Sequence, residues 1–403
     1  MRFTSNRYPP TLTLVINAPL NRYQRKRSLA GVIAAMAVVN LVYGITFPLL
    51  ALVLDAQGVS KTLIGLSTIA QAAAVIVIAP WTPGLLRRFA PSRVMQVVTV
   101  VLALLFIVAG LFPNVWFWFP LRFIIGGMTA LLWISSEALI NELAEERWRG
   151  RIIGFYSSVG AAGFALGPLL LILTGSSGMM PFYATCVMIL LAGIPLFVVS
   201  HRQMDHAQEH HSGLWKVFAL APTIMIANVV YAAGAESVLT FFPLFGMSLG
   251  LSENFTLGLL TTIGLGAMVL VMPISWLADH VDRMGLLAVC VLLTMVGLLL
   301  MPWLIRIPNV AGVYAFLFGG AEGMIYTLGV IMVGQRFRGA MLAVATTMFT
   351  ACWGAGTMLG PLLVGIGMDR YGADKMAFII FLFFAVFLPM PVVSYLRSRR
   401  SLA

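Results

Sequence analysis

Four charged residues interrupt long apolar runs of the sequence, and their side chains are the ones best suited to chemistry. Arg122 and Glu137 lie in the stretch FPLRFIIGGMTALLWISSEALI, Glu236 lies in YAAGAESVLTFF, and Glu322 lies in FGGAEGMIYTL. A carboxyl group among apolar atoms holds its proton more strongly than one in water, and a nearby arginine opposes this effect. A buried carboxyl near Arg122 could therefore exchange a proton near neutral pH. Glu236 is the first candidate, Glu322 the second, and Glu137 the third.

The segment that contains Arg122 has one polar stripe. At about 100° per residue, Arg122 shares a helix face with Gly126, Thr129, Trp133 and Glu137. This face must contact protein or water, because a charge that faces lipid costs roughly 2.5–3.5 kcal/mol or more. Arg122 is thus a candidate to line an internal cavity, where it could also anchor an anion. Glu137 has an alternative role as an interfacial carboxylate paired with Arg147 or Arg151.

Polar and aromatic residues accompany the other two glutamates. They provide possible contacts for a small molecule, but either glutamate could instead form a permanent hydrogen-bonded pair that only holds helices together. Near Glu236 these residues are Asn228 and Tyr231, near Glu322 the residue is Tyr326, and the first apolar run adds Asn40, Tyr43 and Phe47 at helical spacing.

The composition predicts that helices in a membrane position these residues. Hydrophobic residues make up 60% of the 403 residues and charged residues 10%, far from the balance of a soluble domain. Long apolar runs alternate with short polar connectors, and each run can cross a bilayer as a helix of about 20 residues. The sequence therefore predicts an all-α polytopic membrane protein with twelve transmembrane helices. The runs are approximately 29–54, 62–85, 93–112, 115–143, 149–173, 180–200, 214–247, 255–277, 285–303, 309–334, 339–367 and 375–396.

The basic residues predict how these helices are oriented. If the N-terminus is inside, 20 of the 25 lysines and arginines fall in segments on the inner side, and the outer loops hold only Lys61, Arg306, Arg370 and Lys375. This asymmetry places both termini in the cytoplasm. The net charge of +11 then reflects topology and contact with anionic membrane lipid, and it does not indicate nucleic-acid binding. The N-terminal tail, residues 1–28, does not have the pattern of a cleaved signal.

The chain repeats itself. Gly126-Gly127 recurs as Gly319-Gly320, and GFALGPLL recurs as GTMLGPLL, both after about 193 residues. Two parallel halves of six helices with a site between them are typical of secondary transporters. The expected boundaries are a cytosolic tail 1–28, a first half 29–200, a cytosolic linker 201–213, a second half 214–396 and a C-terminal tail 397–403. Arg122 and Glu137 correspond to Ala315 and Val330 in the repeat, so the charges are specialised while the scaffold is shared.

Three motifs resemble those of the major facilitator superfamily, and the resemblance extends over essentially the whole chain. LRFIIGG resembles the arginine-glycine motif of the fourth helix, and WLADHVDRMG resembles the cytoplasmic loop motif between the second and third helices of a half. The GxxxGP sequences resemble the motif of the fifth and eleventh helices. The first-half loop, PGLLRRFAPSR, lacks the acidic residue of that motif. Two further segments, SSEALINELAEERWRGRIIGFY and RFRGAMLAVATTMFTACWGAG, look closer to a bacterial branch of permeases whose substrates are mostly unassigned.

The resemblance implies roles for the motif residues. It suggests that the first, fourth, seventh and tenth helices line a central cavity and that the loop motif forms a latch in one access state. The alternative for the loop motif is a solvated turn with a helix cap. The glycines and prolines allow close helix packing and bending. The expected gating residues are Asp279, Asp282 and Arg283 in the loop, and Gly163, Gly167, Pro168, Gly356, Gly360 and Pro361 in the helices.

Other kinds of chemistry find little support in the sequence. The five histidines lie in predicted cytosolic loops, so no metal site is expected, although His206 and His210 are four residues apart. The cysteines Cys186, Cys290 and Cys352 lie far apart in apolar runs, which favours packing over disulfides. We find no phosphate-binding glycine-lysine loop and no paired nucleophile and base within a run. No enzymatic activity and no cofactor are therefore expected.

The sequence predicts a secondary active transporter of a small molecule that works by alternating access with protons as the coupling ion. Three glutamates and several aromatic rings favour an amphipathic or cationic solute, and the resemblance to the family favours efflux as the direction of transport. Proton-coupled uptake or export of a sugar or organic acid is the alternative, with Arg122 as an anion anchor. A transporter-like membrane sensor is an alternative of another class. The expected setting is the bacterial cytoplasmic membrane, and the expected state is a monomer.

Overall fold

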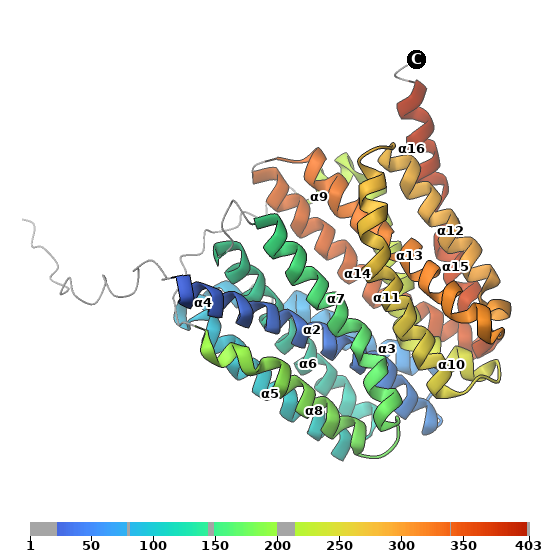
Figure 1. The fold of residues 1–403 in the computed structure, drawn as a ribbon. Helices are drawn as coiled ribbons and strands as arrows, with labels where there is room; N and C mark the ends of the chain where they lie inside the picture. Colours follow the sequence, from blue (N-terminus) through green and yellow to red (C-terminus); the bar gives the residue numbers. More distant parts are fainter. Residues whose placement is uncertain (1–21, 79–80, 144–148, 200–213, 339, 401–403) are drawn as a thin grey trace, which may run out of the picture.

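The computed structural model describes residues 22–78, 81–143, 149–199, 214–338 and 340–400, and every regular element in these ranges is a helix (Figure 1). Eleven of the described helical stretches are long and apolar enough to cross a membrane. A twelfth apolar stretch, Ser158–Thr174, is shorter. The prediction of an all-α membrane protein is confirmed, and twelve membrane helices are consistent with these stretches.

The first half of the chain forms one bundle, drawn in blue to green in Figure 1. Its helices are α2 (Arg22–Ala56), α3 (Lys61–Ile78), α4 (Thr82–Arg88), α5 (Pro91–Leu111), α6 (Val115–Leu143), α7 (Arg149–Thr174), α8 (Met180–Gly193) and the 3₁₀ helix η2 (Ile194–Val198).

The second half forms the other bundle, drawn in yellow to red in Figure 1. Its helices are α9 (Leu214–Leu220), α10 (Pro222–Ser248), α11 (Glu253–Ala278), α12 (Arg283–Leu304), α13 (Pro308–Arg336), α14 (Ala340–Tyr371), the 3₁₀ helix η3 (Ala373–Lys375), α15 (Met376–Phe387) and α16 (Pro389–Arg400).

Several predicted helix boundaries differ from the structure. The run 214–247 is two helices, because the chain leaves the helical region at Ala221 before Pro222 opens α10. Proline lacks an N–H group and disfavours helical geometry in the preceding residue, so it readily starts a new helix. At the N-terminus, α2 begins at Arg22, inside the segment predicted as a tail. Arginine, lysine and glutamine are good helix formers, and they extend the apolar helix by two turns.

The sequence repeat corresponds to a repeat in helix packing. Helix α7 packs on α2, where a side chain at Gly167 would collide with the backbone of Gly44. The equivalent pair in the second half is α14 on α10, where a side chain at Gly360 would collide with the backbone of Ala233. Small residues allow helix backbones to approach this closely in a membrane. The two GxxxGP motifs therefore fix the same helix pair in both bundles.

A second repeated contact joins α6 to α3 and α13 to α11. A side chain at Gly126 would collide with the carbonyl group of Gln71, and one at Gly319 would collide with the carbonyl group of Ile263. Because α6 and α13 are held by backbone contact at these glycines, the residues one to four turns further along them keep a fixed direction. Those residues include Trp133 and Glu137 on α6.

The two bundles meet along α3 with α14, α7 with α11, and α2 with α10. The charge count predicts that the ends of these helices near Lys61 are extracellular, and we call this side the predicted outer face. Near it, the α3–α14 contact is tight, since side chains at Gly65 and Gly365 would collide with the opposite backbone. On the same side, the α7–α11 contact is looser at Gly258, where an added Cβ atom would have Ile172 Cδ1 as its nearest neighbour at 3.9 Å. The two helices come closer further along, where a Cβ atom at Gly264 would lie 3.3 Å from that of Ala165.

Candidate functional site

Glu236 lies on α10 at the junction between the two bundles. Its side chain is 5% exposed, and Oε2 has no hydrogen-bond partner among the described residues. Its charge lies within electrostatic reach of Tyr43, which comes from α2 in the other bundle, and of Tyr231, one turn and a half earlier on α10. Burial of an unpaired carboxylate is costly, so this group is best accommodated with a bound proton or beside a mobile cation.

Glu322, on α13, is buried in the same way as Glu236. It is also 5% exposed, and Oε1 has no hydrogen-bond partner among the described residues. Tyr231 lies within electrostatic reach of both Glu322 and Glu236, and its ring centroid is 5.6 Å from that of Tyr326. The second bundle therefore holds two buried carboxyl groups that both lie within electrostatic reach of one tyrosine hydroxyl.

Three aromatic rings connect the two bundles, and we call them the aromatic bridge: Tyr43 on α2, Trp133 on α6 and Trp353 on α14. The Trp353 ring lies edge-on to both partners, with centroid distances of 6.5 Å to Tyr43 and 6.0 Å to Trp133. Trp133 donates a hydrogen bond from Nε1 to Oε1 of Glu137 at 2.6 Å. The predicted stripe on α6 is thus continuous with a ring from the other half of the chain.

Trp353 and its neighbour Phe349 were not among the predicted site residues. Phe349 contacts Tyr326 at 5.6 Å between centroids, and its carbonyl oxygen accepts a hydrogen bond of 2.6 Å from Asn228 Nδ2. Both rings share a helix face with Gly356 and Gly360, at positions i, i+4, i+7 and i+11. The helical spacing from these motif glycines could therefore have identified Phe349 and Trp353 as site residues.

The remaining predicted cavity residues lie around the bridge. Thr129 is fully buried, bonds its own helix carbonyls at 2.9 Å and contributes a hydrogen-bond contact to Tyr43. Asn40 is half-buried, and its Nδ2 donates to the Met36 carbonyl oxygen at 3.0 Å. Asn228 is 1% exposed, and its Oδ1 has no hydrogen-bond partner within the described ranges. Of these residues, Thr129 lies on the helix face of the bridge residue Trp133. Asn40 and Asn228 bond carbonyl groups within their own bundles.

Arg122 lies elsewhere, buried within the first bundle between α6 and α3. Its side chain is 0% exposed, and Nη1 donates a hydrogen bond of 2.6 Å to Ser67 Oγ. Nε, Nη2 and the side-chain amide of Gln71 have no partner among the described residues. The structure therefore does not form the pair of Arg122 with a buried carboxyl group that the sequence suggested.

The predicted loop motif forms a compact turn between α11 and α12. Asp282 accepts a hydrogen bond from the Gly285 backbone N–H at 2.7 Å and so caps α12, and Asp279 pairs with Arg283 at 3.0 Å. Both contacts lie inside the turn, as in the helix-cap alternative. His280 packs on Trp276, whereas His206 and His210 lie outside the described residues.

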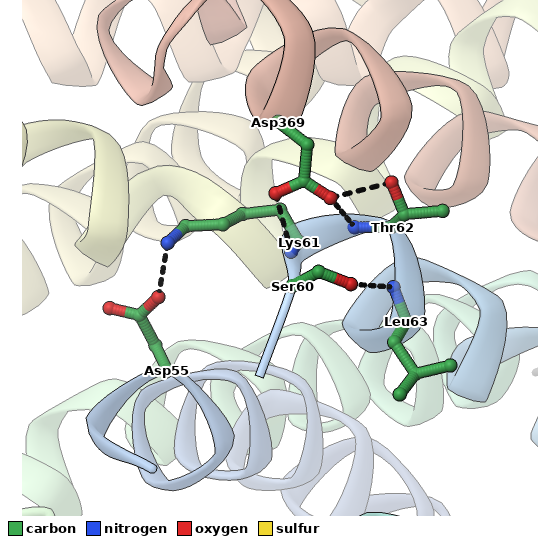
Figure 2. Close-up of polar contacts among 6 residues, drawn as sticks. All are labelled: Asp55, Ser60, Lys61, Thr62, Leu63 and Asp369. Carbon is green, nitrogen blue, oxygen red and sulfur yellow. Dashed lines mark hydrogen bonds and ion pairs between the residues drawn. The ribbon is translucent and has the colours of Figure 1, made fainter. Parts of the chain in front are cut away.

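Asp369, near the end of α14, joins the two bundles at the predicted outer face (Figure 2). Its carboxylate accepts hydrogen bonds from the backbone N–H groups of Lys61 and Thr62 at 2.9 and 2.7 Å, and from Thr62 Oγ1 at 2.6 Å. Lys61 also pairs with Asp55 at 2.6 Å. A carboxylate at the N-terminus of α3 satisfies free N–H groups and interacts favourably with the helix dipole. Asp369 is thus a helix cap supplied by the opposite bundle.

Replacing Asp369 by Ala is expected to raise the equilibrium constant for separation of the two bundles at this face by about tenfold. Hydrogen bonds to a charged group contribute up to about 3 kcal/mol each, but Asp369 is exposed, so a total near 1–2 kcal/mol is reasonable. Spin labels at the exposed residues Gln57 and Tyr371, placed in both proteins, would report the distance distribution across the contact. Asp374→Asn is the matched control, because among the described residues the ion pair of Asp374 is with its sequence neighbour Lys375. An unchanged distribution in Asp369→Ala would contradict the role of the cap.

Comparison with known proteins gives a consistent assignment. The family model of the Major Facilitator Superfamily matches residues 32–307 and 224–402. The uncharacterized MFS-type transporter YfkF of Bacillus subtilis is 23% identical over 350 residues, which cover 84% of this chain and 88% of that protein. Among solved structures, the nucleoside transporter NupG aligns with a TM-score of 0.74 over 92% of this chain and 99% of that chain, at 14% identity. A D-xylose–proton symporter aligns with a TM-score of 0.70 over 90% of this chain and 97% of that chain, also at 14% identity.

Proposed function

Because the chain belongs to the Major Facilitator Superfamily and is therefore a membrane transporter of a small molecule and not an enzyme, we propose that it couples transport to protons. In this proposal, the two bundles alternate access to a site between them. Glu236 carries the coupling proton, and the driving force is the proton gradient across the bacterial cytoplasmic membrane.

One observation supports this proposal most directly. Glu236 is a buried carboxyl group with an oxygen that has no hydrogen-bond partner in the part of the chain that the structure describes, and it lies at the junction of the bundles, within electrostatic reach of Tyr43 of the other half. The surroundings of this group change whenever the bundles move relative to each other. A carboxyl group whose surroundings alternate between apolar and wet binds a proton in one state and releases it in the other. Glu322 is the second candidate and Glu137 the third.

The charges around the aromatic bridge favour an amphipathic or cationic solute. Glu137 and Glu236 lie near its two ends, while Arg122 is enclosed within the first bundle. We propose export as the direction of transport, with protons moving inward. We also propose that the protein is a monomer with both termini in the cytoplasm and with its basic residues facing anionic lipid.

A second candidate is transport of a polar metabolite such as a sugar or an organic acid. The similarity in fold to a nucleoside transporter and to a D-xylose–proton symporter favours this alternative. Arg122 would contribute two unpartnered guanidinium nitrogens to an anionic solute if movement of α3 exposed them.

The test is proton flux in liposomes that contain the purified full-length protein. With a pH-sensitive dye inside, we expect a candidate solute to start proton movement only in the presence of protein. The panel contains lipophilic amines, quaternary ammonium compounds, sugars, nucleosides and organic acids. Solute uptake that proceeds without any proton movement would exclude proton coupling. Proton movement with neutral sugars or acids alone would favour the second candidate.

A further inference from the structure

We infer that the aromatic bridge binds a lipophilic organic ammonium group, with Trp353 as the side chain that recognises the cation. This inference rests on the proposed function, since it names the chemical class of the transported solute. It depends on three features of the described residues: the arrangement of the rings, the carboxylates at their ends, and the absence of a protein cation on their faces.

The rings of the bridge come from both bundles and remain partly accessible. Trp133 and Trp353 are half-buried, whereas Tyr43 is 7% exposed. The Trp353 ring is edge-on to both neighbours, with interplanar angles of 81° to Tyr43 and 63° to Trp133. Because rings at such angles present faces in different directions, a rounded group that lies beside them can contact more than one face, whereas a flat group can stack on only one. This geometry suits the alkyl groups around an ammonium nitrogen better than a planar base.

Each end of the bridge lies near a carboxylate. At the α6 end, Trp133 donates its indole N–H to Glu137, and at the α2 end Tyr43 lies within electrostatic reach of Glu236. Glu137 in turn lies within electrostatic reach of Tyr326, which is 37% exposed and belongs to the second bundle. When Glu236 has released its proton, negative charge therefore approaches the rings from both bundles, and this arrangement attracts a cation that lies beside them.

No described lysine or arginine occupies the faces of these rings. The cation–π contacts of the described residues involve Tyr23, Phe89 and Tyr371, all away from the bridge. Trp is the strongest aromatic partner for a cation, and quaternary and tertiary ammonium groups are the ligands that aromatic sites bind best. A small inorganic cation is less suitable, because ring faces replace its tight hydration poorly. The bridge therefore favours a large, weakly hydrated organic cation.

The experiment compares two probes of the same shape. Phenethyltrimethylammonium carries the charge, and 3,3-dimethylbutylbenzene is its neutral carbon isostere. Equilibrium dialysis with the purified full-length protein gives a dissociation constant for each. We expect the wild type to prefer the cation by at least about tenfold, the size of a desolvated cation–π contact. Equal affinity for the two probes would overturn the inference.

Variants of Trp353 test whether this side chain causes the preference for the cationic probe over the neutral one. Trp353→Ala is expected to weaken binding of the cation about tenfold or more and to leave the neutral isostere nearly unchanged. Trp353→Phe keeps a ring and is expected to retain an intermediate preference, which also guards against a folding defect in the alanine variant. Trp303→Ala is the matched control, because Trp303 is 64% exposed at the end of α12. A full preference in both Trp353 variants would overturn the assignment of Trp353.

The outcome separates this inference from the proposed function. If the cation is not preferred but a neutral solute still drives proton flux in liposomes, the ammonium site is wrong and proton-coupled transport stands. If the cation is preferred and moves without proton flux, the site stands and the coupling is wrong.

Discussion

Replacing Glu236 by Gln is expected to reduce transport driven by a pH gradient on the order of 100-fold, the size typical of removing a positioned proton-transfer group. Glutamine has nearly the same shape, but it cannot take up or release a proton. Exchange of labelled for unlabelled solute requires no net proton movement, so it should persist. The pH dependence of the wild-type exchange rate should disappear in the variant. The measurement is solute flux in liposomes, with and without a pH gradient.

Glu253→Gln provides the matched control for this experiment. Glu253 lies in the first turn of α11 at the predicted outer face, where it is only half-buried. Its replacement should leave both gradient-driven transport and exchange within about twofold of the wild type. If Glu236→Gln retains gradient-driven transport, the coupling proton resides on Glu322 or Glu137, and the same substitution at each of them would identify which. Loss of exchange together with gradient-driven transport would instead indicate a binding defect.

The second large effect is expected at Gly360. A Cβ atom there would collide with the backbone of Ala233, so α14 and α10 must separate to accommodate any side chain. Overpacking of this kind costs about 1–3 kcal/mol or more. We expect Gly360→Ala to lower the midpoint of thermal unfolding in detergent by several degrees and Gly360→Leu by about 5–10 °C.

Gly354, six residues earlier on α14, is a matched control with the opposite expected sign. A Cβ atom there would have no neighbour within 4 Å. Because alanine restricts the unfolded chain more than glycine does, Gly354→Ala should leave the midpoint unchanged or raise it slightly. Equal losses at both positions would show that the helix itself is sensitive and that close packing on α10 is not the cause.

The packing of the bundles could be predicted from the sequence because it follows a local rule. Gly126, Gly167, Gly319 and Gly360 recur at nearly one offset, and the structure places each one against the backbone of a neighbouring helix. The boundary at Pro222 was missed because apolar composition continues across it. Hydropathy reports the length of a run, whereas a helix break depends on the backbone of a single residue.

The candidate site was predicted only in part. Tyr231 and Tyr326 were identified beside glutamates, and the structure places their rings in contact. Trp353 and Asp369 were not identified, since their partners lie in the other half of the chain and no short spacing connects them. Arg122 was expected near a carboxyl group, but its partner is Ser67 on α3. Helical periodicity shows which residues share one face of a helix, but it does not show which neighbouring helix packs against that face.

The two outer contacts between the bundles, related by the repeat, differ in strength. Along α3 and α14, backbone meets backbone and Asp369 caps the opposite helix, whereas along α7 and α11 the side chain of Ile172 lies over Gly258 without such a cap. A rotation that separates the bundles should therefore have its axis close to α3 and α14, because near the predicted outer face the described residues of α7 and α11 provide neither a cap nor a backbone contact at a glycine. The resulting outward opening would be wedge-shaped and widest beside α7 and α11. A bulky solute would then pass along one side of the molecule.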